Sequence, residues 1–272
     1  MTKRKARPTK GQMLIWLVLI LAIPAFFWYE NNLAAFWYNR SQCAEPRRRT
    51  WKTFDAPIPA GYAVYGLDVS HYTCEIDWNE VKKMNDAGRR IRFAYMRATR
   101  GLSLIDYRFS ENWDATKDAN LKRGAYHFFT FSDDATQQAN FYLKNVKIEK
   151  GDLPPVLDIE NDKKSNDQSL QKSDILRGIE TWLKAVENET GMKPMIYTNL
   201  DYYKRYINGN FDGYPIWIAS YNNLKGVTLP DNRKWWFWQF SDQARCNGVS
   251  ERADLNVFIG NEAQLASICK KN

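Results

Sequence analysis

The segment Pro154-Pro155-Val156-Leu157-Asp158-Ile159-Glu160-Asn161-Asp162 carries two carboxylates, one residue apart, in an otherwise apolar run that predicts a β-strand. Side chains alternate between the two faces of a strand, so Asp158 and Glu160 share one face while Leu157 and Ile159 share the other. We expect the apolar face to pack under a layer of helices and the two acids to project into a cleft at the end of the strand.

Two carboxylates in this arrangement lie about 6.6 Å apart along the strand, at roughly 3.3 Å per residue. Repulsion between the like charges raises their pKa values, so one carboxyl can stay protonated while its neighbour is ionised. This is the chemistry of a glycosidase acid/base pair. The alternative is an edge strand with two solvated acids, and the apolar run led by two prolines argues against it.

Strand-like and helix-like patterns alternate through the rest of the chain. The predicted strands are 63–70, 91–98, 123–130, 155–160, 194–199, 215–221, 235–240 and 253–258, with predicted helices at 78–87, 109–121, 134–146 and 173–189. Gly191 is placed to end the last of these helices. The fold class is therefore α/β: a single TIM-like barrel with abbreviated later helices, of the (β/α)5(β)3 type, preceded by an N-terminal apolar helix.

The active site of such a barrel lies at the C-terminal ends of the strands. The residues expected there are Asp68, Arg97, His127, Asp158, Glu160, Tyr197, Tyr221, Gln239 and Asp254.

The N-terminal region predicts an export signal. Residues 1–12 form a basic tail, expected to be cytoplasmic, and residues 13–29 form an uncharged apolar run. That run is at the boundary between a signal peptide and a membrane-spanning helix, and no small-x-small cleavage site follows it. We expect a signal anchor that holds the catalytic domain in the cell envelope, outside the inner membrane; a cleaved signal peptide, and hence a secreted protein, is the alternative. Residues 30–61 predict a linker that leads into the barrel domain, residues 62–272.

The net charge of +8 on 272 residues is confined to this N-terminal region. Residues 1–52 contain ten Lys or Arg and two acids, which leaves 29 basic and 29 acidic residues in the remainder. A basic groove for nucleic acid is therefore not predicted. With only His71 and His127 in the chain, a zinc site is not predicted either, and we expect no metal and no cofactor.

Four scattered cysteines in an exported chain predict disulfides rather than a metal site. Cys74 and Cys246 follow the first and seventh predicted strands, and Cys43 and Cys269 lie near the two ends of the exported part. We therefore expect the pairs Cys74–Cys246 and Cys43–Cys269.

Seven motifs, in order from about residue 62 to residue 260, resemble those of the glycoside hydrolase family 25 lysozymes, which are N-acetylmuramidases. They are Gly66-Leu67-Asp68-Val69-Ser70 with Ile76-Asp77-Trp78, Arg123-Gly124-Ala125-Tyr126-His127-Phe128, Asp158-Ile159-Glu160, Ile196-Tyr197-Thr198, Trp217-Ile218-Ala219-Ser220-Tyr221, Trp238-Gln239-Phe240-Ser241 and Ala253-Asp254-Leu255-Asn256-Val257-Phe258. Cys74 and Ala253 depart from the residues common in the family, and neither is a proposed catalytic group.

The resemblance implies a peptidoglycan-degrading lysozyme that hydrolyses the β-1,4 bond between N-acetylmuramic acid and N-acetylglucosamine. It assigns Glu160 as general acid with a raised pKa, and Asp158, with an ordinary pKa, as the group that orients and charge-stabilises the N-acetyl group or the attacking water. Asp68 completes the catalytic set. The expected substrate-binding residues are Asp254, Tyr126, Tyr197, Trp217, Tyr221 and Trp238.

The expected partners are peptidoglycan glycan strands and, through the N-terminal segment, the membrane; the protein is expected to be a monomer. Three other functions are compatible with parts of the sequence. A wall-binding module would keep the aromatic residues and lose an acid, and a membrane-tethered scaffold would use the barrel only as a platform. A chitinase-like hydrolase also spaces its carboxylates by one residue, but its longer run of alternating acids is absent here.

Overall fold

The computed structural model describes residues 51–161, 169–221 and 223–271 of the chain. Its elements, in chain order, are β1 (Val64–Val69), η1 (His71–Thr73), α2 (Trp78–Lys83), β2 (Ile91–Arg100), β3 (Leu104–Ile105), α3 (Phe109–Asp118), β4 (Lys122–Phe128), α4 (Ala135–Asn145), β5 (Val156–Ile159), α5 (Lys172–Thr190), β6 (Met195–Asn199), α6 (Leu200–Tyr202), η3 (Tyr203–Ile207), β7 (Ile216–Ala219), β8 (Phe237–Ala244), β9 (Ala253–Phe258) and α7 (Glu262–Ser267).

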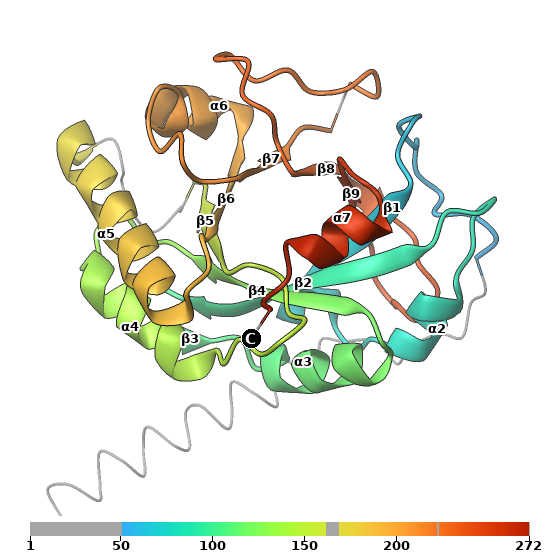
Figure 1. Ribbon diagram of the computed structural model, residues 1–272. Coiled ribbons are helices and arrows are strands. Elements are labelled where there is room, and N and C mark those ends of the chain that lie inside the picture. Colours follow the sequence, from blue (N-terminus) through green and yellow to red (C-terminus); the bar gives the residue numbers. More distant parts are fainter. Residues whose placement is uncertain (1–50, 162–168, 222, 272) are drawn as a thin grey trace, which may run out of the picture. The chain divides into compact units, whose positions relative to one another are not determined.

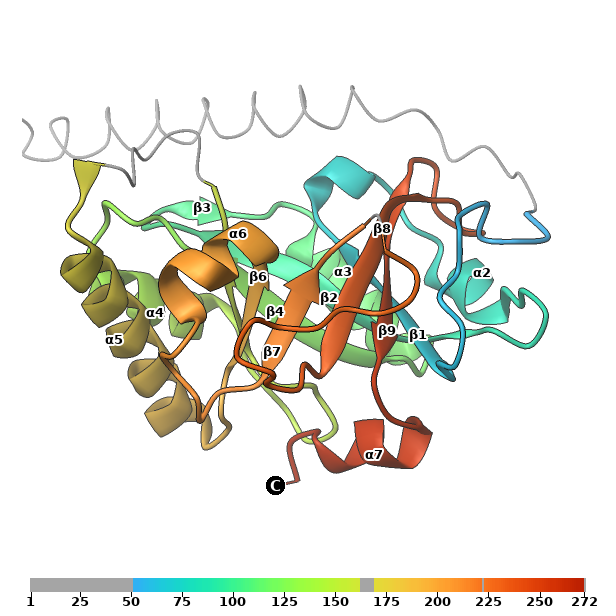
Figure 2. The same ribbon diagram turned by 90° about the horizontal axis from the view of Figure 1, so that it is seen from above.

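Eight of the strands form a closed barrel, as the sequence predicted (Figures 1 and 2). The sheet runs in the order β1-β9-β8-β7-β6-β5-β4-β2, and β1 also pairs with β2, which closes the circle. The two-residue strand β3 adds to the end of β2 as a short antiparallel extension. The mixed α/β barrel is thus confirmed, and each predicted strand corresponds to one of the eight.

Strand β9 departs from a TIM-like arrangement because it runs antiparallel to both of its neighbours, β1 and β8. The other barrel pairs, from β1 through β8, are parallel. A parallel connection needs a dozen or more residues, and only residues 245–252 separate β8 from β9. The short connection therefore reverses the chain, and the start of β9 lies at the end of the barrel where the other strands finish.

The barrel is held together by two apolar clusters, one on each face of the sheet. The outer cluster joins alternate strand residues such as Leu157 and Ile159 to the covering helices, including Ile179 and Leu183 of α5. The cluster inside the barrel contains the large rings of Phe93, Tyr95, Trp217, Phe237 and Phe258. This cluster fills the end of the barrel where the parallel strands begin. The polar residues lie at the other end, where these strands finish.

Two glycines on the neighbouring strands make room for the rings of β2. A Cβ atom at Gly66 would lie 2.3 Å from the Phe93 ring, and one at Gly124 would lie 2.1 Å from the Tyr95 ring. No real Cβ approaches a ring so closely, so a side chain at either position would displace the barrel interior.

The helices that follow the first strands cover the outside of the barrel (Figure 1). Helix α5 ends at Gly191, as predicted, because this residue takes a left-handed backbone conformation with φ of 69°. Helix α2 is shorter than predicted and ends at Lys83, since Met84 is already non-helical and Ala87 and Gly88 have positive φ. The connections that follow β7 and β8 contain no helix among their described residues.

Little of the N-terminal region falls within the described residues. The predicted tail (1–12) and apolar segment (13–29) lie outside them. Within the ranges that are described, no helix is both long and apolar enough to cross a membrane. The described end of the predicted linker packs on the barrel domain: Phe54 is fully buried, and its carbonyl accepts a hydrogen bond from the Arg245 amide.

The predicted cysteine pairing is wrong. Cys246 and Cys269 are both free, buried thiols, so neither Cys74–Cys246 nor Cys43–Cys269 exists. Cys74 is disulfide-bonded, and Cys43 lies outside the described residues. Positions along the chain suggested the pairs, but they do not show which side chains pack into the core: Cys269 packs in the cluster inside the barrel and Cys246 in the outer one.

Candidate active site

Strand β5 and the residue after it place two acids, Asp158 and Glu160, at one end of the barrel, as the alternation of side chains predicted. Asp158 is opposite Tyr197 of β6 in the parallel register, and Glu160 follows directly after the end of the strand. Leu157 and Ile159 are fully buried in the outer cluster. The apolar residues between the acids therefore anchor the strand, while the acids face the barrel axis.

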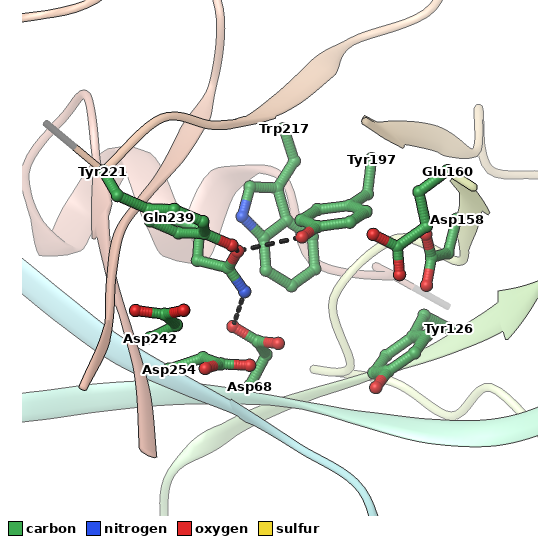
Figure 3. Close-up of a pocket in the computed structure, with 10 residues that line it drawn as sticks. All are labelled: Asp68, Tyr126, Asp158, Glu160, Tyr197, Trp217, Tyr221, Gln239, Asp242 and Asp254. Atoms are coloured by element: carbon green, nitrogen blue, oxygen red, sulfur yellow. Dashed lines mark hydrogen bonds between the residues drawn. The ribbon is translucent and has the colours of Figure 1, made fainter. Parts of the chain in front are cut away.

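A cavity of about 170 Å³ opens at this end of the barrel (Figure 3). It is lined by Asp68, Tyr126, Asp158, Glu160, Tyr197, Trp217, Tyr221, Gln239, Asp242 and Asp254. Arg97, His127 and Trp238 were also predicted at the site and are not in this set; the other predicted site residues are. Gln239 was expected at a strand end without a role, and Asp242 was missed. Side-chain alternation gave no signal for Asp242, because a spacing of three residues puts Asp242 and Gln239 on opposite faces of a regular strand. Strand β8 continues beyond the predicted end at residue 240, and its register shifts between Gln239 and Ser241 and again between Ser241 and Ala244.

The structure does not place Trp238 in the cavity, which corrects its assignment as a substrate-binding residue. Its neighbour Gln239 faces the barrel axis, so Trp238 faces outward. The Trp238 ring packs against Tyr62, Trp235 and Phe240, and its indole N–H donates to the Ser220 carbonyl at 2.8 Å. Because the ring is fully buried, it has no surface to offer a sugar.

Asp68 is the centre of a hydrogen-bond network in the cavity. Its Oδ2 atom accepts from Gln239 Nε2 at 2.8 Å and from Asn256 Nδ2 at 2.7 Å. The Oδ1 atom of Asn256 accepts from Trp217 Nε1 at 2.8 Å, which fixes the orientation of that amide. Asp68 is therefore held by two oriented amide donors.

Burial and mutual repulsion raise the pKa values of the acids in this cavity. Burial, followed by the charge of Asp68, raises the pKa of Glu160 to about 7 and that of Asp254 to about 9. Burial also raises the pKa of Asp68, against the opposing effect of its amide donors. The four acids therefore do not all ionise at neutral pH.

The pKa of Asp158 also lies well above its ordinary value, mainly because of burial and then because of the charge on Glu160. The sequence-based expectation of an ordinary pKa for Asp158 is therefore wrong. The family resemblance implied that ordinary value, whereas the Asp158 side chain is almost completely buried. Its Oδ1 atom has no hydrogen-bond partner among the described residues.

Arg97 is the buried cation of this region. Asp106 accepts from Arg97 Nε at 3.1 Å and from the backbone N–H of His71 at 2.9 Å. The positive charge of Arg97 lowers the pKa values of Asp158 and Glu160 and so opposes part of the effect of burial. The exposed ring of Tyr72 covers the guanidinium, with 5.3 Å between the Arg97 Cζ atom and the ring centroid.

His127 does not face the cavity. Its ring is buried between Thr99, which contacts Nδ1 at 2.8 Å, and Gln138, which contacts Nε2 at 3.1 Å, and it stacks on Trp182. Burial lowers the pKa of His127 to about 4, so the ring is neutral and structural. Within the described residues, no group of three or more His, Cys, Asp or Glu side chains could hold a metal ion.

The comparisons with known proteins agree with this arrangement. Residues 67–249 match the family described as "Glycosyl hydrolases family 25". The chain is 41% identical over 219 residues to the uncharacterized protein YegX of Escherichia coli K12, covering 80% of this chain and 77% of that protein. It is 33% identical over 215 residues to Lysozyme M1 of Streptomyces globisporus, covering 75% and 71% of the two chains.

Among solved structures, a family 25 glycosyl hydrolase from Bacillus anthracis superimposes with a TM-score of 0.71 at 32% identity, covering 77% of this chain and 94% of that one. The bacterial lysozyme from Streptomyces coelicolor superimposes with a TM-score of 0.69 at 31% identity, covering 76% of this chain and 97% of that one.

Proposed function

The chain belongs to glycosyl hydrolase family 25, and from that premise we propose that it is a lysozyme of the N-acetylmuramidase type. Its substrate is the glycan strand of peptidoglycan, and it hydrolyses the β-1,4 bond between N-acetylmuramic acid and N-acetylglucosamine. The observation that carries the proposal is the pair Asp158 and Glu160, which opens into a cavity lined by tyrosines, a tryptophan and further acids.

Glu160 is proposed as the general acid. Its pKa of about 7 keeps a large fraction of the carboxyl protonated near neutral pH, where it can donate to the glycosidic oxygen. The bond between C1 of N-acetylmuramic acid and that oxygen then breaks. The proton leaves with the O4 hydroxyl of N-acetylglucosamine, and water supplies the new hydroxyl at C1 and returns its other proton to the Glu160 carboxylate.

Asp158 is proposed to orient the N-acetyl group or the attacking water and to stabilise the developing positive charge. Its unpartnered Oδ1 atom is available to accept a hydrogen bond from either group. A hydrogen bond donated to a carboxylate favours its ionised form. Substrate binding would therefore ionise Asp158 and leave the proton that the pair shares on Glu160, where the reaction needs it.

Asp68 and Asp254 are proposed to flank the reacting sugar and to set the charge that Glu160 experiences. The rings of Tyr126, Tyr197, Trp217 and Tyr221 line the cavity and would cover the flat C–H faces of the sugars. Tyr221 is the most open of these rings, with 41% of its surface exposed.

The proposal also includes the barrel type, the membrane topology and the oligomeric state. The helical crossovers are consistent with the (β/α)5(β)3 description of the barrel. The N-terminal segment 13–29 would hold the domain on the outer side of the inner membrane, or export it if the segment is cleaved. A monomer suffices for the reaction, because one chain supplies every proposed site residue.

Digestion of purified peptidoglycan followed by mass spectrometry of the muropeptides tests the function. We expect products with a new reducing N-acetylmuramic acid end, and activity that persists in a chelator because carboxyl groups carry out the chemistry. A new reducing N-acetylglucosamine end would assign a different bond, and cleavage of chitin in preference to peptidoglycan would favour the chitinase-like alternative. Failure to cleave any glycan would leave a binding or scaffold role.

A further inference from the structure

Gln239 is almost completely buried, with 2% of its surface exposed, and both ends of its amide are engaged. Its Oε1 atom accepts from the hydroxyls of Tyr197, at 2.8 Å, and Tyr221, at 2.6 Å. Its Nε2 atom donates to Asp68 at 2.8 Å (Figure 3). Gln239 therefore forms hydrogen bonds with Asp68, Tyr197 and Tyr221, which come from different strands or loops. The sequence placed Gln239 at a strand end and gave it no role.

The Asp68 carboxylate determines which end of the Gln239 amide faces it, because the carboxylate only accepts hydrogen bonds whereas the two tyrosine hydroxyls can donate or accept. If the amide were reversed, its carbonyl oxygen would face the Asp68 carboxylate and its NH₂ group would face the two hydroxyls. Two acceptors in contact repel unless one of them carries a proton. The orientation of Gln239 and the ionisation of Asp68 are therefore linked.

We propose that Gln239 is a positioning residue for the hydrolysis: it holds Asp68 ionised and pointed at the acid pair of β5, while Tyr197 and Tyr221 hold the other end of its amide. The inference rests on the proposed function. Asn256 supplies the second amide donor to the same oxygen of Asp68 and accepts from Trp217, whereas Gln239 connects that carboxylate to the hydroxyls of Tyr197 and Tyr221.

The charge of Asp68 matters to the general acid. Negative charge on Asp68 raises the pKa of Glu160, while the hydrogen bond from Gln239 lowers the pKa of Asp68 itself. Loss of the donor should therefore protonate Asp68 at a higher pH, whereas the pH at which Glu160 loses its proton should not fall, because Asp68 is already ionised there. The charged or titratable groups around Asp68 are Arg97, Tyr126, Asp158, Glu160, Tyr197, Tyr221, Asp242 and Asp254.

The test is the pH profile of kcat/KM for wild type and Gln239→Met, a change of similar shape that removes both hydrogen-bonding ends. We expect the acidic limb of the variant's profile to move to higher pH by about one pH unit, which is the scale of one charge-assisted hydrogen bond, and the alkaline limb not to move to lower pH. A lower rate with both limbs unmoved would overturn the proposal and leave Gln239 with a packing role.

Gln138→Met is the matched control. Gln138 is a fully buried glutamine whose amide bonds to His127 and to the backbone of Thr130, outside the cavity. Its replacement should lower the melting temperature without moving either limb.

Two further measurements test the role of Gln239: the first does not need Gln239→Met to fold, and the second does not need turnover. Tyr221→Phe removes one donor to Gln239 from a partly exposed position, so it should fold even if Gln239→Met does not. We expect a smaller shift of the acidic limb in the same direction, and an unmoved acidic limb would contradict the proposal. A carboxyl ¹³C NMR titration of Asp68 needs no turnover. A raised Asp68 pKa in the variants supports the inference even if the wild-type protein cleaves no peptidoglycan, whereas an unchanged Asp68 pKa overturns it whatever the activity.

Discussion

Asp68 of β1 and Asp254 of β9 are directly opposite each other in the register of two antiparallel strands. Their side chains share a hydrogen bond, and because the pKa of Asp254 is raised to about 9, the proton of this bond resides on Asp254. The two residues are 186 positions apart in the sequence. The reversed direction of β9 is what brings them into contact at the catalytic end.

Replacement of Glu160 by Gln should abolish most of the activity and leave the protein folded. The amide cannot donate a proton to the leaving oxygen, so we expect kcat to fall by at least about 100-fold. The measurement is turnover of purified peptidoglycan at pH 6. Glu180→Gln, a change at an exposed position of α5, is the control and should keep wild-type activity; retention of activity by Glu160→Gln would remove this residue from the mechanism.

The same variant should be more stable than wild type at alkaline pH. The pKa of Glu160 is raised from 4.5 to about 7 in the folded protein, so its stabilising contribution is present below pH 4.5 and is lost as the pH rises through 7. Glu160→Gln removes this loss, on the order of 1–3 kcal/mol at pH 8. Thermal unfolding of both proteins at pH 5 and pH 8 measures it, and an equal difference at the two pH values would contradict the raised pKa.

Replacement of Asp158 by Asn should lower kcat to a similar degree. An amide cannot carry the negative charge that the developing cation requires, and the expected loss is about 100-fold or more. The matched control is Asp152→Asn, which changes a buried aspartate paired with Arg123 outside the cavity; it should reduce stability and leave kcat unchanged. A rise in KM alone for Asp158→Asn would make Asp158 a binding residue.

Replacement of Gly124 by Ala should destabilise the barrel. The added methyl group would lie 2.1 Å from the Tyr95 ring, and overpacking of this kind costs about 1–3 kcal/mol. The melting temperature should therefore fall by about 2–4 °C for each kcal/mol. Gly213→Ala, where the nearest atom is the end of the Lys193 side chain at 3.4 Å, is the control; equal melting temperatures for the two variants would show that the interior can relax around the methyl group.

The sequence alone predicted the eight barrel strands and the acid pair, because both depend on local periodicity. Alternation of apolar residues identified the strands, and alternation within β5 placed Asp158 and Glu160 on one face. The order of the seven motifs along the chain also indicated the family. These features depend on residues that are neighbours along the chain.

Tertiary structure decided what depends on residues far apart in sequence. The direction of β9 places Asp254 at the site. The Trp238 side chain points outward and packs on Trp235, so it does not line the cavity. Burial by several strands raised the pKa of Asp158 and left Cys246 and Cys269 as free thiols. Only the converging hydroxyls of Tyr197 and Tyr221 gave Gln239 its role. Burial, charge and hydrogen-bond partners are supplied by the whole barrel, so no local pattern within one segment encodes them.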